Sequence, residues 1–237
     1  MRRCAVLVWW SAMIVRVCAV SHTVFCMVTA GRRVSYLGET LGSYERERVL
    51  GYDGVGLIVV DVDGRSNSSW AVGLVDRVME KCDGADVEGV PSCVTRQSTR
   101  DMAAALVLCG KYASGWVVLV EDDNLLCEGA LDELVGTLGT LDRQAIALAK
   151  FSPLSTGMSF PVGKVGKYVN YTLGRVNTHP YDVTRVEEWD AGGAVYRHRT
   201  SLFQHIGRVS TQEYRNSEEF RKLYASMRDY ECGRSIL

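Results

Sequence analysis

The sequence predicts an α/β protein built on a mostly parallel sheet, and three observations lead to this prediction. Short runs of β-branched and apolar residues alternate with stretches of helical periodicity as far as residue 151. The expected strands are almost entirely apolar, which is typical of strands with helices on both faces. Of the 237 residues, 47% are hydrophobic and 23% are charged, so the chain has an ordinary globular composition with enough apolar residues for a sizeable core.

The expected elements follow one another in a regular order. A strand at residues 23–28 precedes a helix at residues 36–46, for which Ser35 is the expected N-cap. Further strands are expected at residues 56–62, 116–120 and 145–151, and further helices at residues 70–82, 102–112 and 130–141. Between residues 152 and 184, Gly, Ser, Thr, Tyr and Asn predominate, which favours loops and short hairpins. One or two strands are expected within residues 194–205, followed by a charged amphipathic helix at residues 211–230.

Charge and cysteine content exclude several classes of protein. The formal net charge of −1 argues against a nucleic-acid partner, since such proteins usually carry a basic excess. No two of the eight cysteines form a C-x-x-C pair, which excludes zinc ribbons and thioredoxin-like motifs. Cys82 and Cys93 flank a short polar loop and are close enough in sequence to form a disulfide in an oxidising compartment. The alternative is that all eight cysteines are small buried apolar residues.

The N-terminus favours the secretory pathway. An uncharged apolar run at residues 4–15 has the length of a signal-peptide core, and with one arginine tolerated it extends into a marginal signal-anchor that would attach the chain to a membrane. Two glycosylation sequons, at Asn67 and Asn170, are compatible with a lumenal domain. We therefore expect a signal peptide or anchor at residues 1–21 and a single domain at residues 22–237. The alternative is a truncated gene start or a buried first strand of a cytosolic protein.

Three consecutive carboxylates, Glu121, Asp122 and Asp123, follow the most apolar expected strand. Such a group at the carboxyl end of a buried strand is costly unless a positive charge lies close by. Ligands of open α/β sheets bind at this edge, and Mg²⁺ or Mn²⁺ takes carboxylate oxygens while sharing its other positions with phosphate. The triplet therefore indicates a divalent cation site, the alternative being a strand end whose charges point into water.

Several segments, in the same order, resemble a family of glycosyltransferases. Glu-Asp-Asp is similar to the metal motif of GT-A enzymes, a variant of Asp-X-Asp. Residues 34–43, Val-Ser-Tyr-Leu-Gly-Glu-Thr-Leu-Gly-Ser, resemble a helix of N-acetylglucosaminyltransferase IV and the related GPI-side-chain GalNAc transferase. Further likenesses are Phe151-Ser152 with Gly157 and Phe160, Pro180-Tyr181-Asp182, and residues 201–207, Ser-Leu-Phe-Gln-His-Ile-Gly, followed by Ser210.

This resemblance implies a GT-A-type, Rossmann-like fold with a smaller loop-rich C-terminal half. It implies an inverting, metal-dependent enzyme of the Golgi or ER that transfers a HexNAc to a glycan such as an N-glycan mannose. The preferred sugar is GlcNAc, with UDP-GlcNAc as the donor. The alternatives are transfer of GalNAc or a hexose to a GPI or other surface glycan, a catalytically silent glycan-binding relative, and, ranked lower, a nucleotidyltransferase. The implied Mn²⁺ or Mg²⁺ ligands are Asp123, Asp122 and His205.

The same resemblance suggests roles for the remaining site residues. Asp182 is the expected base for the acceptor hydroxyl, with Glu187, Glu188 and Asp190 as alternatives, and Glu121 is expected to orient the site. Carboxylates at strand ends can accept from uracil or ribose, arginines can bind phosphate, and a glycine allows close approach of the sugar. The expected donor-binding residues are Thr29, Arg33, Asp61, Asp63, Arg96, Asp101, Asp122 and Gly157. The alternative for the arginines is that they are surface charges.

Overall fold

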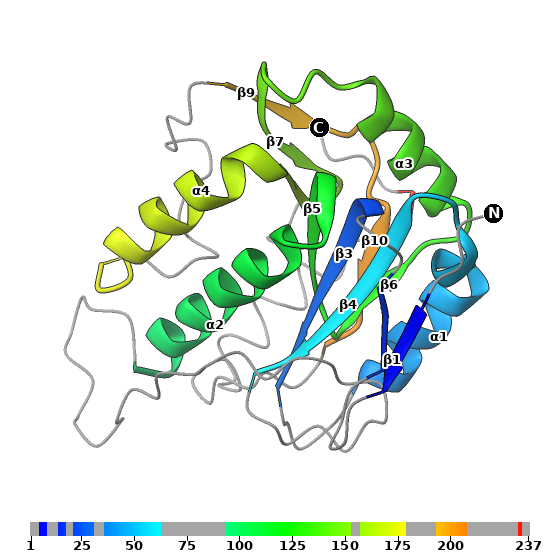
Figure 1. Ribbon diagram of the computed structural model, residues 1–237, viewed down its shortest axis with the longest axis horizontal. Helices are drawn as coiled ribbons and strands as arrows, with labels where there is room; N and C mark the ends of the chain where they lie inside the picture. Colours follow the sequence, from blue (N-terminus) through cyan, green and yellow to red (C-terminus); the bar gives the residue numbers. More distant parts are fainter. Residues whose placement is uncertain are drawn as a thin grey trace.

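The computed structural model describes residues 5–8, 14–17, 21–30, 36–62, 93–152, 157–178, 193–207 and 232–233. Its centre is a six-stranded sheet with the order β4-β3-β5-β8-β7-β9 (Figure 1). The strands are β3 (Ser21–Thr29), β4 (Val55–Asp61), β5 (Ala113–Glu121), β7 (Ile146–Lys150), β8 (Met158–Pro161) and β9 (Ala194–Arg197). β3 is parallel to β4 and β5, β7 is parallel to β9, and β8 is antiparallel to both of its neighbours. The predicted α/β fold with a mostly parallel sheet is therefore confirmed.

Helices cover both faces of this sheet (Figure 1). On one face lie α2 (Cys93–Gly110) and α4 (Val162–Gly174); on the other lie α1 (Leu37–Arg46), the short 3-10 helix η1 (Val49–Gly51) and α3 (Ala130–Thr140). The side chains of β5 alternate between the two cores, since Val117 and Leu119 pack with α2 and α4 whereas Trp116 and Val118 pack with α1 and α3. The continuous apolar run of β5 is thus explained by burial on both sides.

Two smaller sheets accompany the large one. β1 (Ala5–Val8) pairs antiparallel with β2 (Ile14–Val17), and β6 (Asn124–Leu126) pairs antiparallel with β10 (Phe203–His205). β1 and β2 fall in the segment expected to be a signal peptide or anchor, whose role stays a prediction. Among the described residues, no helix combines the length and the apolar character that a membrane crossing requires.

The region after residue 152 differs from its prediction as loops and short hairpins. It contains β8 and α4, so that prediction is wrong. Val165, Tyr168, Val169 and Thr172 form a buried stripe at helical spacing, which packs α4 onto the sheet beside α2. The segment is rich in glycine and polar residues, which lie on the exposed side of α4, so its composition does not reveal the apolar periodicity.

Other elements differ from prediction mainly in their bounds. α2 begins at Cys93, well before the expected start at residue 102, because Thr95 and Gln97 in its polar first turns are buried. The N-cap of α1 is Tyr36, which has helical backbone angles and no capping bond from its side chain, so the prediction of Ser35 is wrong. The helices expected at residues 70–82 and 211–230 lie outside the described residues.

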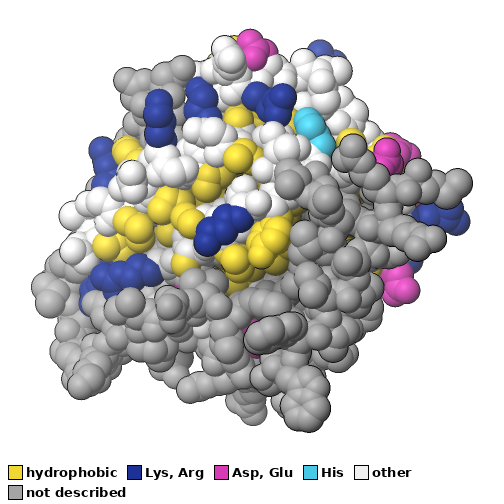
Figure 2. Space-filling view, in the orientation of Figure 1, with side chains coloured by type: hydrophobic (Ala, Val, Ile, Leu, Met, Phe, Trp, Pro, Cys, Tyr) yellow, Lys and Arg dark blue, Asp and Glu magenta, His cyan; other side chains and the backbone are white. Residues whose placement is uncertain are grey.

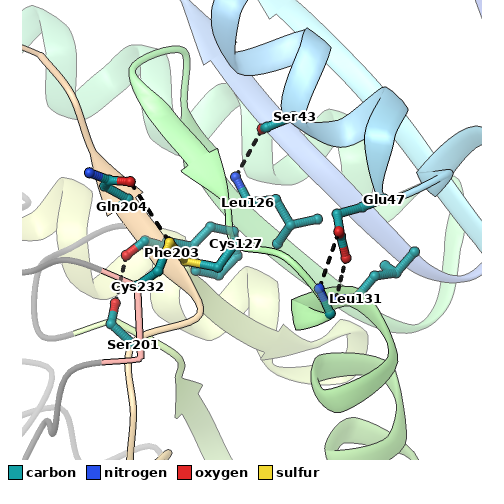
Figure 3. The surroundings of a disulfide bond; sticks show 10 residues. Ser43, Glu47, Leu126, Cys127, Leu131, Ser201, Phe203, Gln204 and Cys232 are labelled. Atoms are coloured by element: carbon teal, nitrogen blue, oxygen red, sulfur yellow. Dashed lines mark hydrogen bonds between the residues drawn. A yellow bond between two sulfur atoms is a disulfide. The ribbon is translucent and has the colours of Figure 1, made fainter.

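The start of α3 is capped from another part of the chain. Its N-cap is Gly129, which has no side chain to accept a hydrogen bond. Glu47, just after α1, accepts from the backbone N–H groups of Gly129 at 3.2 Å and Leu131 at 3.4 Å (Figure 3). A carboxylate at a helix N-terminus is also favoured by the helix dipole, so this contact fastens α3 to the end of α1.

Disulfides link distant segments. Cys26 in β3 is bonded to Cys109 in α2, and Cys127 after β6 is bonded to Cys232 near the end of the chain. Cys93 is also disulfide-bonded, while Cys82, its expected partner, lies outside the described residues. The alternative that the cysteines are unpaired buried apolar residues is therefore wrong, because none of the described cysteines is free.

The side of the molecule on which α2 and α4 lie shows apolar side chains interspersed with Lys and Arg (Figure 2). The large apolar side chains exposed among the described residues are Val94 and Val107 of α2 and Leu173 of α4. Singly exposed apolar residues are ordinary on protein surfaces. These exposed apolar side chains by themselves therefore do not indicate a binding partner.

Candidate functional site

The carboxyl edge of the parallel strands brings Glu121 and Asp123 together with His205. One ligand atom from each of the three side chains lies within 4.8 Å of the other two. Glu121 ends β5, Asp123 lies in the turn that leads into β6, and His205 ends β10. Two carboxylates and one imidazole are donor types that divalent cations such as Mn²⁺ accept, so the set fits such an ion chemically.

The antiparallel pairing of β6 with β10 places His205 in this cluster. Asn124 and His205 are direct partners in the ladder, and the N–H of Ile206 donates to the backbone oxygen of Asp123 at 2.8 Å. His205 Nε2 then lies 3.5 Å from Asp123 Oδ2, and the two side chains are only 14% and 7% exposed. A carboxylate with so little access to water favours a positive charge beside it, from a cation or from the protonated imidazole.

Gly207 leaves room that the cluster needs. A Cβ atom at this position would lie 2.9 Å from Asp123 Cγ and 3.0 Å from His205 Cε1, and closer still to Asp123 Oδ2. Real Cβ atoms do not approach other heavy atoms so closely, so any side chain here would displace a member of the cluster. The glycine therefore permits the observed spacing of Asp123 and His205.

Asp122 lies in different surroundings from its two neighbours and is not a member of the cluster. Thr29 Oγ1 donates to Asp122 Oδ2 at 2.6 Å, and Thr40 Oγ1 donates to the backbone oxygen of Asp122 at 2.7 Å. The N–H of Asp122 donates to the backbone oxygen of Val28 at 3.1 Å. These bonds fix the turn that presents Glu121 and Asp123, and the metal role expected for Asp122 stays a prediction.

Three residues of the expected site end neighbouring strands of the sheet. Thr29 of β3 is the ladder partner of Asp61 of β4, and Val28 is the partner of Glu121 of β5. Thr29 and Asp61 are both buried. The strand ends thus bring a hydroxyl and two carboxylates to one edge, where the nucleotide was expected to bind.

Arg96 and Asp101 both lie on α2. Asp101 is buried and accepts a hydrogen bond from Gln97 Nε2 at 2.8 Å, while Arg96 is half-buried. Neither residue belongs to the cluster at the strand ends. Their contacts with a donor stay predictions.

Gly157 lies in the turn before β8, with a φ of 66° that favours glycine. Its N–H donates to the backbone oxygen of Leu119 at 2.9 Å, and a Cβ here would lie 2.6 Å from the ring of Phe203. The close approach that requires a glycine at this position is therefore to Phe203 of β10. Approach of the sugar to Gly157 stays a prediction.

Several expected residues lie outside the described part of the chain: Arg33, Asp63 and Asp182, together with the alternative bases Glu187, Glu188 and Asp190. The structure also adds two residues that the sequence did not single out. Asn124 donates a hydrogen bond to Asp123. Its position directly after the acidic triplet could have identified it from the sequence. Thr40 supports the turn from α1, a contact between distant segments that leaves no trace in the local sequence.

Comparison with known proteins gives remote likenesses to solved structures. No family model and no curated protein matches the chain. The galactosyltransferase LgtC, solved with donor and acceptor sugar analogs, is 13% identical with a TM-score of 0.46, covering 75% of this chain and 73% of that chain. A glycosyltransferase involved in glycosylation of the major capsid of PBCV-1 is 14% identical with a TM-score of 0.48, covering 86% and 98%. An active-site mutant of LgtC is 14% identical with a TM-score of 0.41, covering 81% of each chain. These solved structures are all glycosyltransferases, and likeness at this level assigns no activity to the present chain.

Proposed function

We propose that the protein is a metal-dependent, inverting glycosyltransferase that moves a sugar from a nucleotide-sugar donor to a glycan acceptor. The observation that carries the proposal is the gathering of Glu121, Asp123 and His205 at the carboxyl edge of a mostly parallel sheet. Open α/β sheets bind their ligands at this edge. A diphosphate needs a cation there, because the edge itself is acidic.

Asp123 and His205 would hold Mn²⁺ or Mg²⁺, with Glu121 beside them. When bound, the cation would neutralise the negative charge of the diphosphate leaving group. The chain's own contribution is rigidity: Thr29 and Thr40 fix the turn around Asp122 by hydrogen bonds of 2.6 and 2.7 Å. Ligands held in this way lose little freedom when the cation binds, which favours affinity.

The remaining roles follow from the needs of an inverting transfer. One base must take the proton of the acceptor hydroxyl as that oxygen attacks the anomeric carbon, and we assign this role to Asp182. Thr29 and Asp61 at the ends of β3 and β4 would meet the nucleoside. The donor we propose is UDP-GlcNAc, with UDP-GalNAc second, and the acceptor is an N-glycan mannose or a GPI-type surface glycan.

We place the protein in the lumen of the secretory pathway, in the Golgi or ER. The disulfides Cys26–Cys109 and Cys127–Cys232 support this location. Structural disulfides persist in oxidising compartments and are rare in the cytosol.

Calorimetric titration of the full chain with UDP, with and without Mn²⁺, tests the proposed function. We expect UDP to bind only when Mn²⁺ is present, and we expect this binding to vanish in Asp123→Ala. Glu128→Ala is the matched control, because Glu128 is an exposed carboxylate close in sequence that is not a member of the cluster.

A turnover assay with UDP-GlcNAc and UDP-GalNAc, monitored by UDP release, completes the test. Asp182→Asn is expected to lose turnover and keep its affinity for UDP. Equal UDP binding by Asp123→Ala and the unchanged protein would contradict the proposal that the cluster binds a metal ion. If the folded protein does not bind UDP at all, the alternative of a catalytically silent glycan-binding protein would be favoured.

A further inference from the structure

We propose that Asn124 is a positioning residue that orients the Asp123 carboxylate toward the cation; this inference rests on the proposed function, because it requires a cation at the cluster. Asn124 is completely buried, and its Nδ2 donates to Asp123 Oδ1 at 2.9 Å. The other carboxylate oxygen, Oδ2, is the one that faces His205 Nε2, at 3.5 Å. Asn124 therefore engages one oxygen of Asp123, and the proposed ion would bind the other oxygen, beside His205.

The direction of this hydrogen bond is fixed by chemistry. An ionised carboxylate only accepts hydrogen bonds, so the atom of the Asn124 amide that faces Asp123 must be the nitrogen. An amide is also neutral, so it can hold the carboxylate without competing with a cation for charge. A lysine or arginine in the same place would neutralise Asp123 and weaken its attraction for the ion.

Backbone pairing positions both the Asn124 amide and the His205 imidazole. Asn124 is the first residue of β6 and is the ladder partner of His205, the last residue of β10. The N–H of Ile206 holds the backbone of Asp123 from the same strand end, at 2.8 Å. One short ladder therefore sets the positions of the amide, the carboxylate and the imidazole relative to one another.

Stability alone gives little reason for an asparagine at this position. Its Oδ1 is buried and has no hydrogen-bond partner in the part of the chain that the structure describes. A buried acceptor without a partner destabilises the folded state by about 1–3 kcal/mol, which offsets much of the stability gained from the bond to Asp123. Retaining an asparagine is understandable if its donor atom serves the neighbouring carboxylate.

The test is Mn²⁺ affinity of the full chain, measured by titration with detection of free Mn²⁺ by electron paramagnetic resonance. We expect Asn124→Leu to weaken Mn²⁺ binding by about 10–100-fold, as is usual when a group that orients a metal ligand is removed. We expect its midpoint of urea unfolding without metal to change little, because the unpartnered Asn124 Oδ1 is removed while Asp123 Oδ1 loses its donor. A purely structural role predicts the opposite: a lower unfolding midpoint with normal Mn²⁺ affinity.

Gln97→Leu is the matched control, since Gln97 Nε2 makes the same kind of bond to a buried carboxylate, Asp101 Oδ1, on α2. It is expected to keep the Mn²⁺ affinity of the unchanged protein. Where Asn124→Leu does not fold, Asn124→Ala removes the same donor without the branched side chain, and the same weakening is expected.

Two outcomes separate this inference from the proposed function. If the unchanged protein binds Mn²⁺ and both Asn124 variants bind it equally well, the positioning role is overturned and the proposed function stands. If the unchanged protein binds no Mn²⁺, the proposed cation site is overturned and the inference falls with it.

Discussion

The six-stranded sheet and the β6–β10 sheet differ in how much of their support comes from apolar packing. The large sheet is buried on both faces by apolar side chains, and Phe25 and Trp116 on it are completely inaccessible. The small sheet has only three residue pairs. Leu126 and Phe203 of the small sheet pack into the core shared with α1 and α3. Individual bonds add to this support, among them the donation from the N–H of Leu126 to Ser43 Oγ and the Cys127–Cys232 disulfide (Figure 3).

This contrast teaches where stability and function reside. A two-stranded ladder of this length is not stable alone, so its position depends on its packing in the core and on the bonds that tie it to α1 and to the end of the chain. The small sheet nevertheless carries His205 and Asn124, which the proposed site needs. Changes in the large sheet should therefore lower the free energy of unfolding, whereas changes in the small sheet should mainly lower cation affinity.

The largest effect is expected from Trp116→Ala in the large sheet. Trp116 lies in β5 and packs against the core shared with α1 and α3. Removing a buried tryptophan should lower the free energy of unfolding by about 3–5 kcal/mol. Urea unfolding followed by circular dichroism checks this, with Leu173→Ala on the exposed side of α4 as a control that changes stability little. A loss below about 1 kcal/mol would contradict the account of the large sheet.

The Cys127–Cys232 bond gives the next prediction, through the double substitution Cys127→Ser and Cys232→Ser. The N–H of Cys127 donates to Leu202, and the N–H of Gly233 donates to Ser201, so the disulfide anchors both sides of the small sheet. We expect a loss of about 2–4 kcal/mol in the free energy of unfolding. We also expect Mn²⁺ affinity to fall about tenfold, which corresponds to 1.4 kcal/mol.

The other disulfide provides the control for this prediction. Cys26→Ala with Cys109→Ala removes a bond of similar kind between β3 and α2, away from the cluster. It should lower stability by a comparable amount and leave Mn²⁺ affinity unchanged in the folded protein. Equal losses of Mn²⁺ affinity in the two double variants would show that the small sheet is not specially coupled to the site.

Gly207→Ala tests the spacing of the cluster beside the small sheet by adding a single carbon atom. The added Cβ would crowd Asp123 and His205, so we expect about tenfold weaker Mn²⁺ binding, or about 1.4 kcal/mol. Gly139→Ala is the control: Gly139 is an exposed α3 residue with open space around its Cα, where alanine favours the helix by about 1 kcal/mol. Normal Mn²⁺ titration by Gly207→Ala would mean that the cluster does not bind the ion at its observed spacing.

The large sheet was predictable because its signals are local. The apolar runs that became β3, β4 and β5 were identified within one or two residues at most ends, since burial on both faces requires continuous apolar sequence. β8 and α4 were missed because short strands and glycine-containing helices have weak local patterns, and their stability comes from packing against β5 and α2.

The candidate site was predictable only in part. Glu121, Asp123 and His205 were singled out from the sequence, by their chemistry and by the family resemblance, and the structure brings them together. The bond between Thr29 and Asp122 was not predicted, because it joins the ends of two strands that are neighbours only in the sheet. The pairing of Cys127 with Cys232 was likewise beyond reach, since sequence alone does not determine disulfide connectivity.

Ser43→Ala is expected to have the smallest effect, and it tests the tie between α1 and the small sheet. Ser43 is buried, accepts from the N–H of Leu126 at 3.0 Å and donates to the backbone oxygen of Thr40 at 2.6 Å. Alanine leaves the buried N–H of Leu126 without this partner, which should lower the free energy of unfolding by about 1 kcal/mol.

A local effect on the site should accompany this small loss. Hydrogen exchange of the Leu126 amide is expected to speed up, with a loss of Mn²⁺ affinity of no more than about threefold, because the disulfide still anchors the ladder. Thr140→Ala is the control, since the exposed Thr140 hydroxyl donates to the backbone oxygen of Thr137 in its own helix. If Ser43→Ala weakened Mn²⁺ binding more than the double cysteine variant did, α1 and not the disulfide would be the main support of the site.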